Sequence, residues 1–220
     1  MHAVHRLIIL SLLMCGSVAA IAQELGNPDC DKLLLVSGYS NNNVKIFDGC
    51  DYSFLRNLDS DGTLIGPQAI ALDPAGDIVV VSESNGRLVR YDRESLTLDA
   101  VIAGDRPETP AIEAPPVNNP TGLVIAPDGR MFVGSYSDQL VAEVDPDTGL
   151  VVRNIVTQSD SGIRGPDTGM WLEGNRLIVP GFDSSSIVEA NVNQTGSSKV
   201  LVSAGADGLN APRTVLRQAN

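Results

Sequence analysis

Few side chains in this 220-residue chain have the type and spacing for acid–base or metal chemistry. Both histidines, His2 and His5, lie within residues 1–22, where Arg6 precedes an apolar run and small residues end at Ala22. This order is typical of a secretory signal peptide, with cleavage predicted after Ala22. Without that segment the chain has no histidine, which excludes a Ser-His-Asp centre, an imidazole base and any zinc site that needs histidine.

Two cysteines remain after the leader, Cys30 and Cys50. An exported chain can keep a disulfide, and thiol catalysis is disfavoured because neither a histidine nor a C-x-x-C partner is present. Both cysteines are ten residues from Ser40, the centre of a predicted hairpin, so symmetric pairing places them opposite each other at its base. We therefore expect a disulfide between them.

Acidic residues offer the other candidate chemistry. The segment Asp59-Ser60-Asp61-Gly62 has the spacing that can begin a calcium loop, but the downstream glutamate of an EF-hand is missing. An Asp-rich turn is the alternative interpretation, and it is the commoner one.

Net charge limits the partners. The chain has 15 Lys and Arg against 27 Asp and Glu, a formal charge of −12. Loss of residues 1–22 leaves 14 against 27, or −13. Such a chain is a poor partner for nucleic acid or an anionic membrane. We predict a secreted or periplasmic protein without a membrane span. The alternatives are an N-terminal anchor, for which the apolar run falls short of about 20 residues, and lipidation at Cys15.

The sequence contains a repeat, and the strands and turns of this repeat must position any functional site. Residues 66–92, 119–145 and 165–191 align without a gap, each with a proline in second place, two apolar runs around a turn, and a closing Asp or Asn. Gly76, Gly129 and Asn175 occupy the turn, and glycine and asparagine are the residues that tolerate left-handed backbone conformations, so the turn position is chemically consistent in all three copies. A shorter copy, residues 33–48, matches residues 77–92.

Four short strands are predicted in each copy, for example at about 68–73, 77–83, 87–92 and 97–103. Hairpin turns between them make each copy an antiparallel meander, and four strands every 40–50 residues are typical of a propeller blade. The sequence therefore predicts an all-β propeller with blades at about 30–58, 66–103, 119–157 and 165–204. A β-sandwich is the alternative, but it does not require a repeated frame.

Residues 211–220 match the start of the repeat, so we expect them to be the first strand of a fifth blade. A strand without its hairpin partner leaves an open edge. The whole of residues 23–220 is then part of a propeller of about six blades, and a four-bladed ring with a short tail is the alternative. The proline-rich segment 104–120 is predicted either to overhang the channel or to be a plain surface loop.

One row of polar side chains follows the proline of each blade and is called here the third-position row: Gln68, Thr121, Asp167 and Arg213. With the nearby Asn119, it is predicted to line the channel mouth and bind a small ligand, with Asp167 as the charged anchor. The alternative is a set of polar residues that serves only solubility.

The repeat frame, clearest at Pro120-Thr121-Gly122-Leu123 and Pro127-Asp128-Gly129-Arg130, resembles NHL repeats and the SMP-30/gluconolactonase family of six-bladed propellers. The resemblance covers residues 33–220 and implies calcium or another divalent metal in the central channel. Only Asp167 matches a carboxylate ligand of that family. The resemblance leaves two functions open: a module that binds a small-molecule or protein ligand or acts as a scaffold, and a metal-dependent lactonase or hydrolase.

Overall fold

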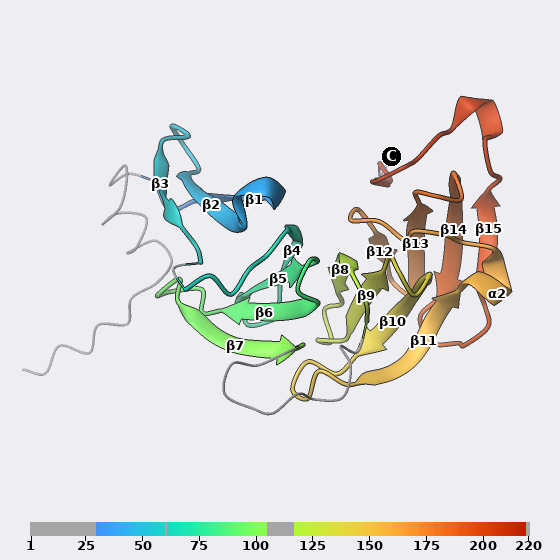
Figure 1. The fold of residues 1–220 in the computed structure, drawn as a ribbon, viewed down its shortest axis with the longest axis horizontal. Coiled ribbons are helices and arrows are strands. Elements are labelled where there is room, and N and C mark those ends of the chain that lie inside the picture. The colour runs from blue at the N-terminus through green and yellow to red at the C-terminus, as the bar shows by residue number, and fades with distance from the viewer. Residues whose placement is uncertain (1–29, 60, 105–116, 219–220) are drawn as a thin grey trace, which may run out of the picture.

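The structure, a computed structural model, describes residues 30–59, 61–104 and 117–218. The predicted signal peptide lies outside these residues, as does most of the proline-rich segment. Within them, strands form four antiparallel sheets, each with its strands in chain order. The sheets follow one another along an arc (Figure 1). The prediction of an all-β propeller with four-stranded antiparallel blades is confirmed.

The strands have the following bounds. The first sheet contains β1 (Leu33–Gly38), β2 (Asn43–Asp48) and β3 (Phe54–Asn57). The second contains β4 (Pro67–Leu72), β5 (Ile78–Ser82), β6 (Arg87–Tyr91) and β7 (Leu98–Ala103). The third contains β8 (Pro120–Ile125), β9 (Met131–Ser135), β10 (Leu140–Val144) and β11 (Val151–Thr157). The fourth contains β12 (Trp171–Glu173), β13 (Arg176–Gly181), β14 (Ser186–Asn191) and β15 (Lys199–Val202). We refer to these sheets as blades 1 to 4.

Helical structure in the described ranges is short: η1 (Tyr39–Asn41), α2 (Gln158–Ser161) and η2 (Ala206–Gly208). No helix there is long and apolar enough to span a membrane.

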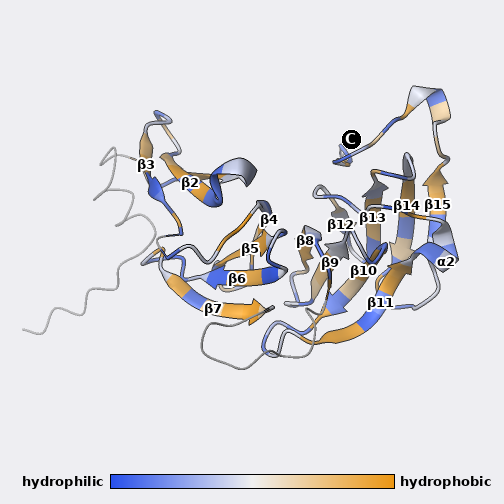
Figure 2. Ribbon diagram, in the orientation of Figure 1, coloured by the Kyte–Doolittle hydropathy of each residue, from blue (hydrophilic) through white to orange (hydrophobic). Residues whose placement is uncertain are grey.

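Alternating side chains of each blade pack against the blades on its two sides. In β5, Ile78 and Val80 join the core shared with blade 1, while Val79 and Val81 join the core shared with blade 3. All four are buried, which explains why this strand is a continuous apolar run in the sequence. Figure 2 shows the apolar residues concentrated in the strands. Burial of one apolar layer between each pair of blades therefore holds the arc together.

The turns lie where the repeat predicts them, but the left-handed residue of the fourth copy differs. Gly76 and Gly129 have φ values of 92° and 87°, as expected, but in the fourth copy Gly174, with a φ of 57°, takes the left-handed conformation instead of Asn175. Glu173 pairs directly with Arg176, so this hairpin has a two-residue loop. Glycine in the first position of such a loop is typical of a type II′ turn.

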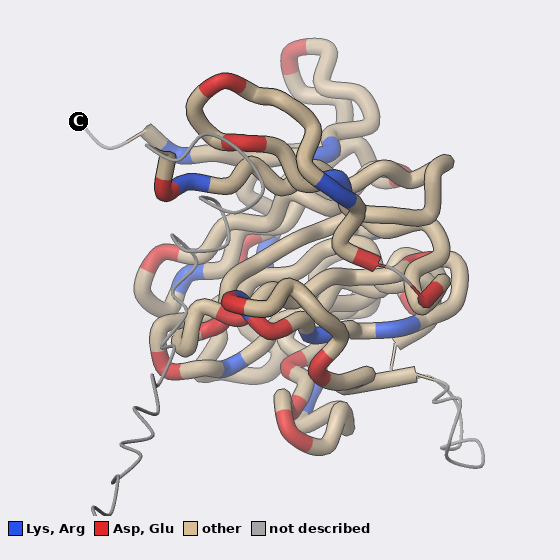
Figure 3. The backbone as a smooth tube through the Cα atoms, turned by 90° about the vertical axis from the view of Figure 1, so that its left-hand side faces the viewer, with Lys and Arg blue, Asp and Glu red and all other residues tan. Residues whose placement is uncertain are grey.

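The closing Asp of the repeat stabilises the turn that follows it in blades 1, 2 and 3. The carboxylate of Asp145 accepts hydrogen bonds from the backbone of Asp147 and Thr148, and Asp48 and Asp92 make equivalent turns. These bonds hold the pKa of Asp145 below its ordinary value, those from Thr148 contributing most. Acidic residues lie at many loop tips (Figure 3), and this turn chemistry accounts for part of the negative charge.

The Asp59 turn is also a structural feature. Its buried carboxylate accepts hydrogen bonds from the Leu64 backbone at 3.1 Å and the Tyr91 hydroxyl at 3.3 Å. Burial, with the nearby Asp59 carboxylate, raises the pKa of Tyr91 far above its ordinary value. These contacts favour the interpretation as an Asp-rich turn.

A disulfide joins Cys30 to Cys50, with their Cα atoms 6.0 Å apart. Leu33 pairs with Asp48 at the open end of the β1–β2 hairpin, so the bridge lies just beyond that end. It ties the segment before β1 to the turn after β2.

Residues 211–218 run along the inner side of blade 4. Thr214 forms a parallel bridge with Gly169, whose N–H donates to the Arg213 carbonyl and whose carbonyl accepts from Val215. The predicted assignment of this segment to a fifth blade, and the total number of blades, stay predictions.

Candidate functional site

The third-position row converges on one cavity. Gln68 lies on β4, Thr121 on β8, and Asp167 and Arg213 lie on the segments that precede β12 and follow β15. All four line a cavity of about 410 Å³. Successive blades thus present the same repeat position to one space, which is the arrangement expected at the mouth of a propeller channel.

A second row lines the same cavity: Tyr39, Glu83, Tyr136 and Phe182. Each directly follows the second strand of the repeat frame, after β1, β5, β9 and β13 respectively. They occupy the eighteenth position of the aligned copies, so we call them the eighteenth-position row. Our sequence reasoning missed this row. The signal was available, because Glu83, Tyr136 and Phe182 each lie fifteen residues after a member of the third-position row.

Tyr39 and Tyr136 pack against glycines that have a left-handed backbone conformation at the start of the following copy. Gly66 and Gly165 have φ values of 63° and 59°. A Cβ on Gly66 would lie 2.8 Å from the ring of Tyr39, and one on Gly165 would lie 2.8 Å from the ring of Tyr136. Each ring therefore packs closely on the backbone of the next blade, which glycine alone permits without strain.

Asn119 does not line this cavity, although the sequence grouped it with the ligand-binding residues. It occupies the first position of its copy and has a φ of 47°. Its carbonyl accepts the Tyr136 N–H at 3.0 Å, and its side chain accepts the Ser137 hydroxyl at 2.7 Å. Asparagine tolerates the left-handed conformation that Gly66 and Gly165 adopt. Asn119 thus serves the turn rather than the cavity.

An ion pair marks one side of the cavity. A carboxylate oxygen of Asp167, whose side chain is 3% exposed, lies 3.3 Å from the guanidinium of Arg213, which is 60% exposed. The other oxygen accepts the Thr168 N–H at 2.7 Å. The guanidinium also lies 4.6 Å from the centre of the Phe182 ring, within the range of a cation–π contact. Asp167 is a buried anion whose charge is compensated by a partly solvated cation.

The remaining polar side chains are held by their neighbours. Gln68 donates to the Glu83 carboxylate at 2.6 Å, linking the two rows within blade 2. The buried Thr121 hydroxyl donates to the Pro166 carbonyl at 2.7 Å, linking blade 3 to the start of blade 4. These bonds fix the cavity wall before any ligand arrives, which lowers the entropic cost of binding.

Tyr136 lies in a field of negative charge. Its hydroxyl donates to Asp183 at 2.9 Å. This bond raises the pKa of Tyr136 above its ordinary value, and burial and the charges of Asp183 and Asp167 act in the same direction. The phenol is therefore neutral near pH 7 and acts as a hydrogen-bond donor.

The cavity residues do not fit a calcium cage. A calcium ion takes 6–8 oxygen ligands, several of them carboxylates. Asp167, the one predicted metal ligand, is paired with Arg213, so a cation already occupies its open side. In the part of the chain that the structure describes, the only group of three or more Asp, Glu, His or Cys residues with ligand atoms close enough to share an ion is Cys30, Asp48 and Cys50, and both cysteines are in the disulfide.

No family model matches this chain, and no curated protein matches its sequence. Solved structures resemble its fold. A chain of a nidogen/laminin complex gives a TM-score of 0.66 at 18% identity, over 86% of this chain and 66% of that chain. A catalytically inactive virginiamycin B lyase from Staphylococcus aureus, solved with quinupristin, gives 0.55 at 12% identity, over 76% and 51%. Kuenenia stuttgartiensis hydrazine synthase gives 0.56 at 18% identity, over 77% and 44%.

This chain therefore spans between 44% and 66% of the length of those structures. They are β-propeller proteins, and at these identities the likeness concerns the fold alone. The chain is a β-propeller whose successive blades direct two rows of side chains to one cavity.

Proposed function

We propose that this protein is an exported propeller, of the NHL or SMP-30 type, that binds a small ligand in the cavity formed by the third-position and eighteenth-position rows. One observation carries the proposal: two repeat positions, supplied by blades 1 to 4 and by the segment after β15, line a single cavity of about 410 Å³, a size suited to a small molecule. The predicted signal peptide and the disulfide between Cys30 and Cys50 support export.

Buried polar groups in the wall also favour binding. Asp167 and Thr121 are each 2% exposed, yet both lie in the cavity wall. A few fixed polar groups among aromatic rings are typical of sites that orient a ligand. A metal-dependent lactonase has less support, because the only carboxylate that matches its ligand set faces Arg213.

The test is a binding screen on the mature full-length protein. A set of small molecules that covers cations, anions and neutral compounds is screened by ligand-observed NMR, and hits are titrated by calorimetry. We expect hits whose affinity falls about tenfold or more in Asp167→Asn, since a hydrogen bond to a charged group contributes about 1.5–3 kcal/mol. Asp147→Asn, in the exposed turn between β10 and β11, is the matched control.

Two results would contradict the proposal. One is a screen without any hit. The other is a set of hits that bind Asp167→Asn and Arg213→Gln as tightly as the unsubstituted protein.

A further inference from the structure

One positive charge, the Arg213 guanidinium, is already bound in the cavity wall by an aromatic ring and a carboxylate. The Arg213 guanidinium lies over the Phe182 ring and against the Asp167 carboxylate, at 4.6 Å and 3.3 Å respectively. Both components, an aromatic face and a carboxylate, attract a cation. Phe182 belongs to the eighteenth-position row and Asp167 to the third-position row.

The preceding blades present the same two components. Tyr39, Glu83 and Tyr136 occupy the eighteenth position of blades 1, 2 and 3, so a carboxylate lies between two aromatic residues in the order of the blades. Glu83 accepts a hydrogen bond from Gln68 on one oxygen. Among the described residues, no Lys or Arg forms an ion pair with Glu83.

The tyrosines are also held in place. Their rings pack against the left-handed glycines Gly66 and Gly165 of the following blades. The Tyr39 hydroxyl lies 3.4 Å from that of Ser84, and the Tyr136 hydroxyl donates to Asp183. Rings fixed in this way lose little freedom when a cation packs on them, so the contact favours binding.

The net negative charge around the cavity also favours a cationic ligand. The cavity wall carries two carboxylates, Glu83 and Asp167, against the single guanidinium of Arg213. Asp183 adds a third negative charge beside Tyr136, whose pKa is raised by its bond to Asp183 and, to a smaller degree, by the charge of Asp167. An anionic ligand would meet this excess, and a cationic ligand would relieve it.

From these observations we infer that the ligand carries a positively charged nitrogen, as an ammonium or guanidinium group on a small apolar body, which pairs with Glu83 beside Tyr39 and Tyr136. This inference rests on the proposed function and adds the chemical class of the ligand. In this inference an organic cation takes the place that the resemblance to the SMP-30/gluconolactonase family gives to a metal ion. Asp167 is already paired with Arg213, and Glu83 has aromatic neighbours instead of further oxygen ligands.

Three probes of similar shape and different charge test the inference. They are 2-phenylethylamine, which is cationic at pH 7, the neutral 2-phenylethanol and the anionic phenylacetate. Each is titrated into the mature protein by calorimetry and by two-dimensional NMR at low ionic strength. We expect the amine to bind at least about tenfold more tightly than the alcohol, since hydrogen bonds between charged groups are about twice as strong as neutral ones. Added salt should weaken binding of the amine.

Glu83→Gln is the decisive variant, because it removes the charge and keeps the shape of the side chain. We expect it to reduce the affinity for the amine about tenfold or more and to leave the affinity for the alcohol unchanged. Glu94→Gln is the matched control, since Glu94 follows β6 at the opposite end of the same blade. Circular dichroism and the unfolding midpoint check that both variants fold.

The outcomes separate the inference from the proposed function. The inference is overturned if the alcohol or phenylacetate binds as tightly as the amine, if Glu83→Gln binds the amine unchanged, or if none of the three probes binds. In each case hits from the wider screen that respond to Asp167→Asn would leave the proposed function standing.

Discussion

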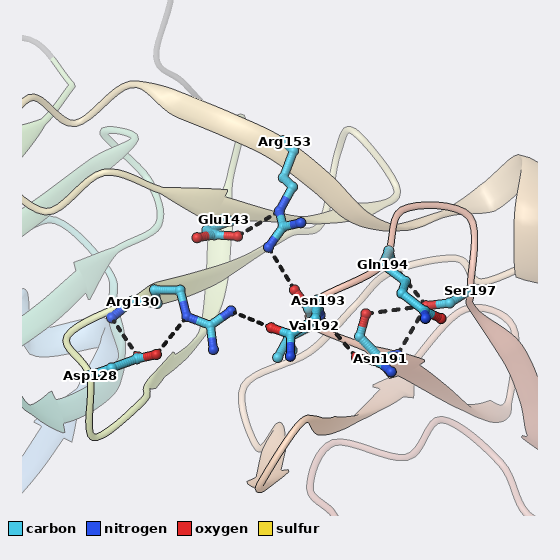
Figure 4. Close-up of polar contacts among 9 residues, drawn as sticks. All are labelled: Asp128, Arg130, Glu143, Arg153, Asn191, Val192, Asn193, Gln194 and Ser197. Atoms are coloured by element: carbon cyan, nitrogen blue, oxygen red, sulfur yellow. Dashed lines mark hydrogen bonds and ion pairs between the residues drawn. The ribbon is translucent and has the colours of Figure 1, made fainter.

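Removal of the Arg153 guanidinium should destabilise the contact between blades 3 and 4. Arg153 donates to Glu143 at 2.7 Å within blade 3, and to the Val192 carbonyl of blade 4 at 2.8 Å (Figure 4). The Glu143 side chain is 9% exposed and that of Arg153 is 30% exposed. Substitution of Arg153 by methionine keeps an apolar side chain of similar length. The loss in unfolding free energy therefore measures the contribution of the guanidinium group.

The structure sets the magnitude. Loss of one partner from a buried ion pair costs about 3–5 kcal/mol, and the partial exposure of Arg153 reduces this because solvent screens the charge. We expect Arg153→Met to lower the free energy of unfolding by about 2–3 kcal/mol. A chain of this size loses about 2–4 °C in Tm for each kcal/mol, so the Tm should fall by roughly 4–12 °C.

Urea unfolding provides the assay. Trp171, the single tryptophan of the chain, lies on β12 of blade 4 and serves as a fluorescent probe beside circular dichroism. Adding Glu143→Gln to Arg153→Met should recover part of the loss, since the buried charge without a partner is removed.

Arg176→Met is the matched control for Arg153→Met. Arg176 pairs with Glu189 inside blade 4, and its side chain is 45% exposed. Loss of such a surface pair should cost much less than loss of the Arg153 contact, because solvent screens its charges. Equal losses in Arg153→Met and Arg176→Met would refute the reasoning, because they would show that the Arg153 contact adds no stability beyond a surface pair.

Three further predictions concern single features of the fold. The disulfide between Cys30 and Cys50 closes a loop with a sequence separation of 20, so its reduction should lower the free energy of unfolding by about 3 kcal/mol, measured with and without a phosphine reductant. Gly149→Ala should cost at least about 2 kcal/mol more than Gly174→Ala in urea unfolding. Both glycines have positive φ, but only at Gly149 would a Cβ meet a backbone oxygen of the neighbouring blade, at 2.1 Å. The pKa of Asp145 is lowered in the folded state, so its stabilising effect is present above the ordinary aspartate pKa and is lost as the pH falls through the folded value. Asp145→Asn should therefore be less stable than the unsubstituted protein at pH 7, and the difference should shrink as the pH falls below the ordinary aspartate pKa; a difference that stays constant with falling pH would contradict the assignment.

The repeat allowed most of the blade architecture to be predicted. The strands expected at about 68–73, 77–83, 87–92 and 97–103 correspond to β4, β5, β6 and β7 within two residues at each end. Apolar alternation and glycine turns are local signals, so they identify strands without any knowledge of the neighbouring blades. The turn that contains Asn175 is present, but its left-handed residue is Gly174, because loop length, which depends on how two strands pair, decides which residue is left-handed.

The site was harder to predict than the fold. The third-position row could be found because it follows a proline, and the proline marks its register. The eighteenth-position row has no neighbouring proline to mark it: three of its members are aromatic and one is a glutamate, so only its fixed spacing from the third-position row identifies it. Asn119 was predicted to bind a ligand because an asparagine next to a predicted site is a plausible binding residue. Its role in the turn depends on its left-handed backbone conformation, which the residue type alone does not reveal.

The residues that build the blades occupy different repeat positions from the residues that line the cavity. The second position is proline, the first is left-handed in all copies, including Ala211 with a φ of 47°, and the last is Asp or Asn. These positions satisfy turn and strand geometry, so substitution there alters stability. The third and eighteenth positions vary freely in chemistry, from Gln to Arg and from Tyr to Glu, and yet all of their side chains reach one cavity. Neither position belongs to the interblade core, which consists of apolar residues elsewhere in the strands. The side chains that line the cavity therefore differ from blade to blade while the blade fold stays the same.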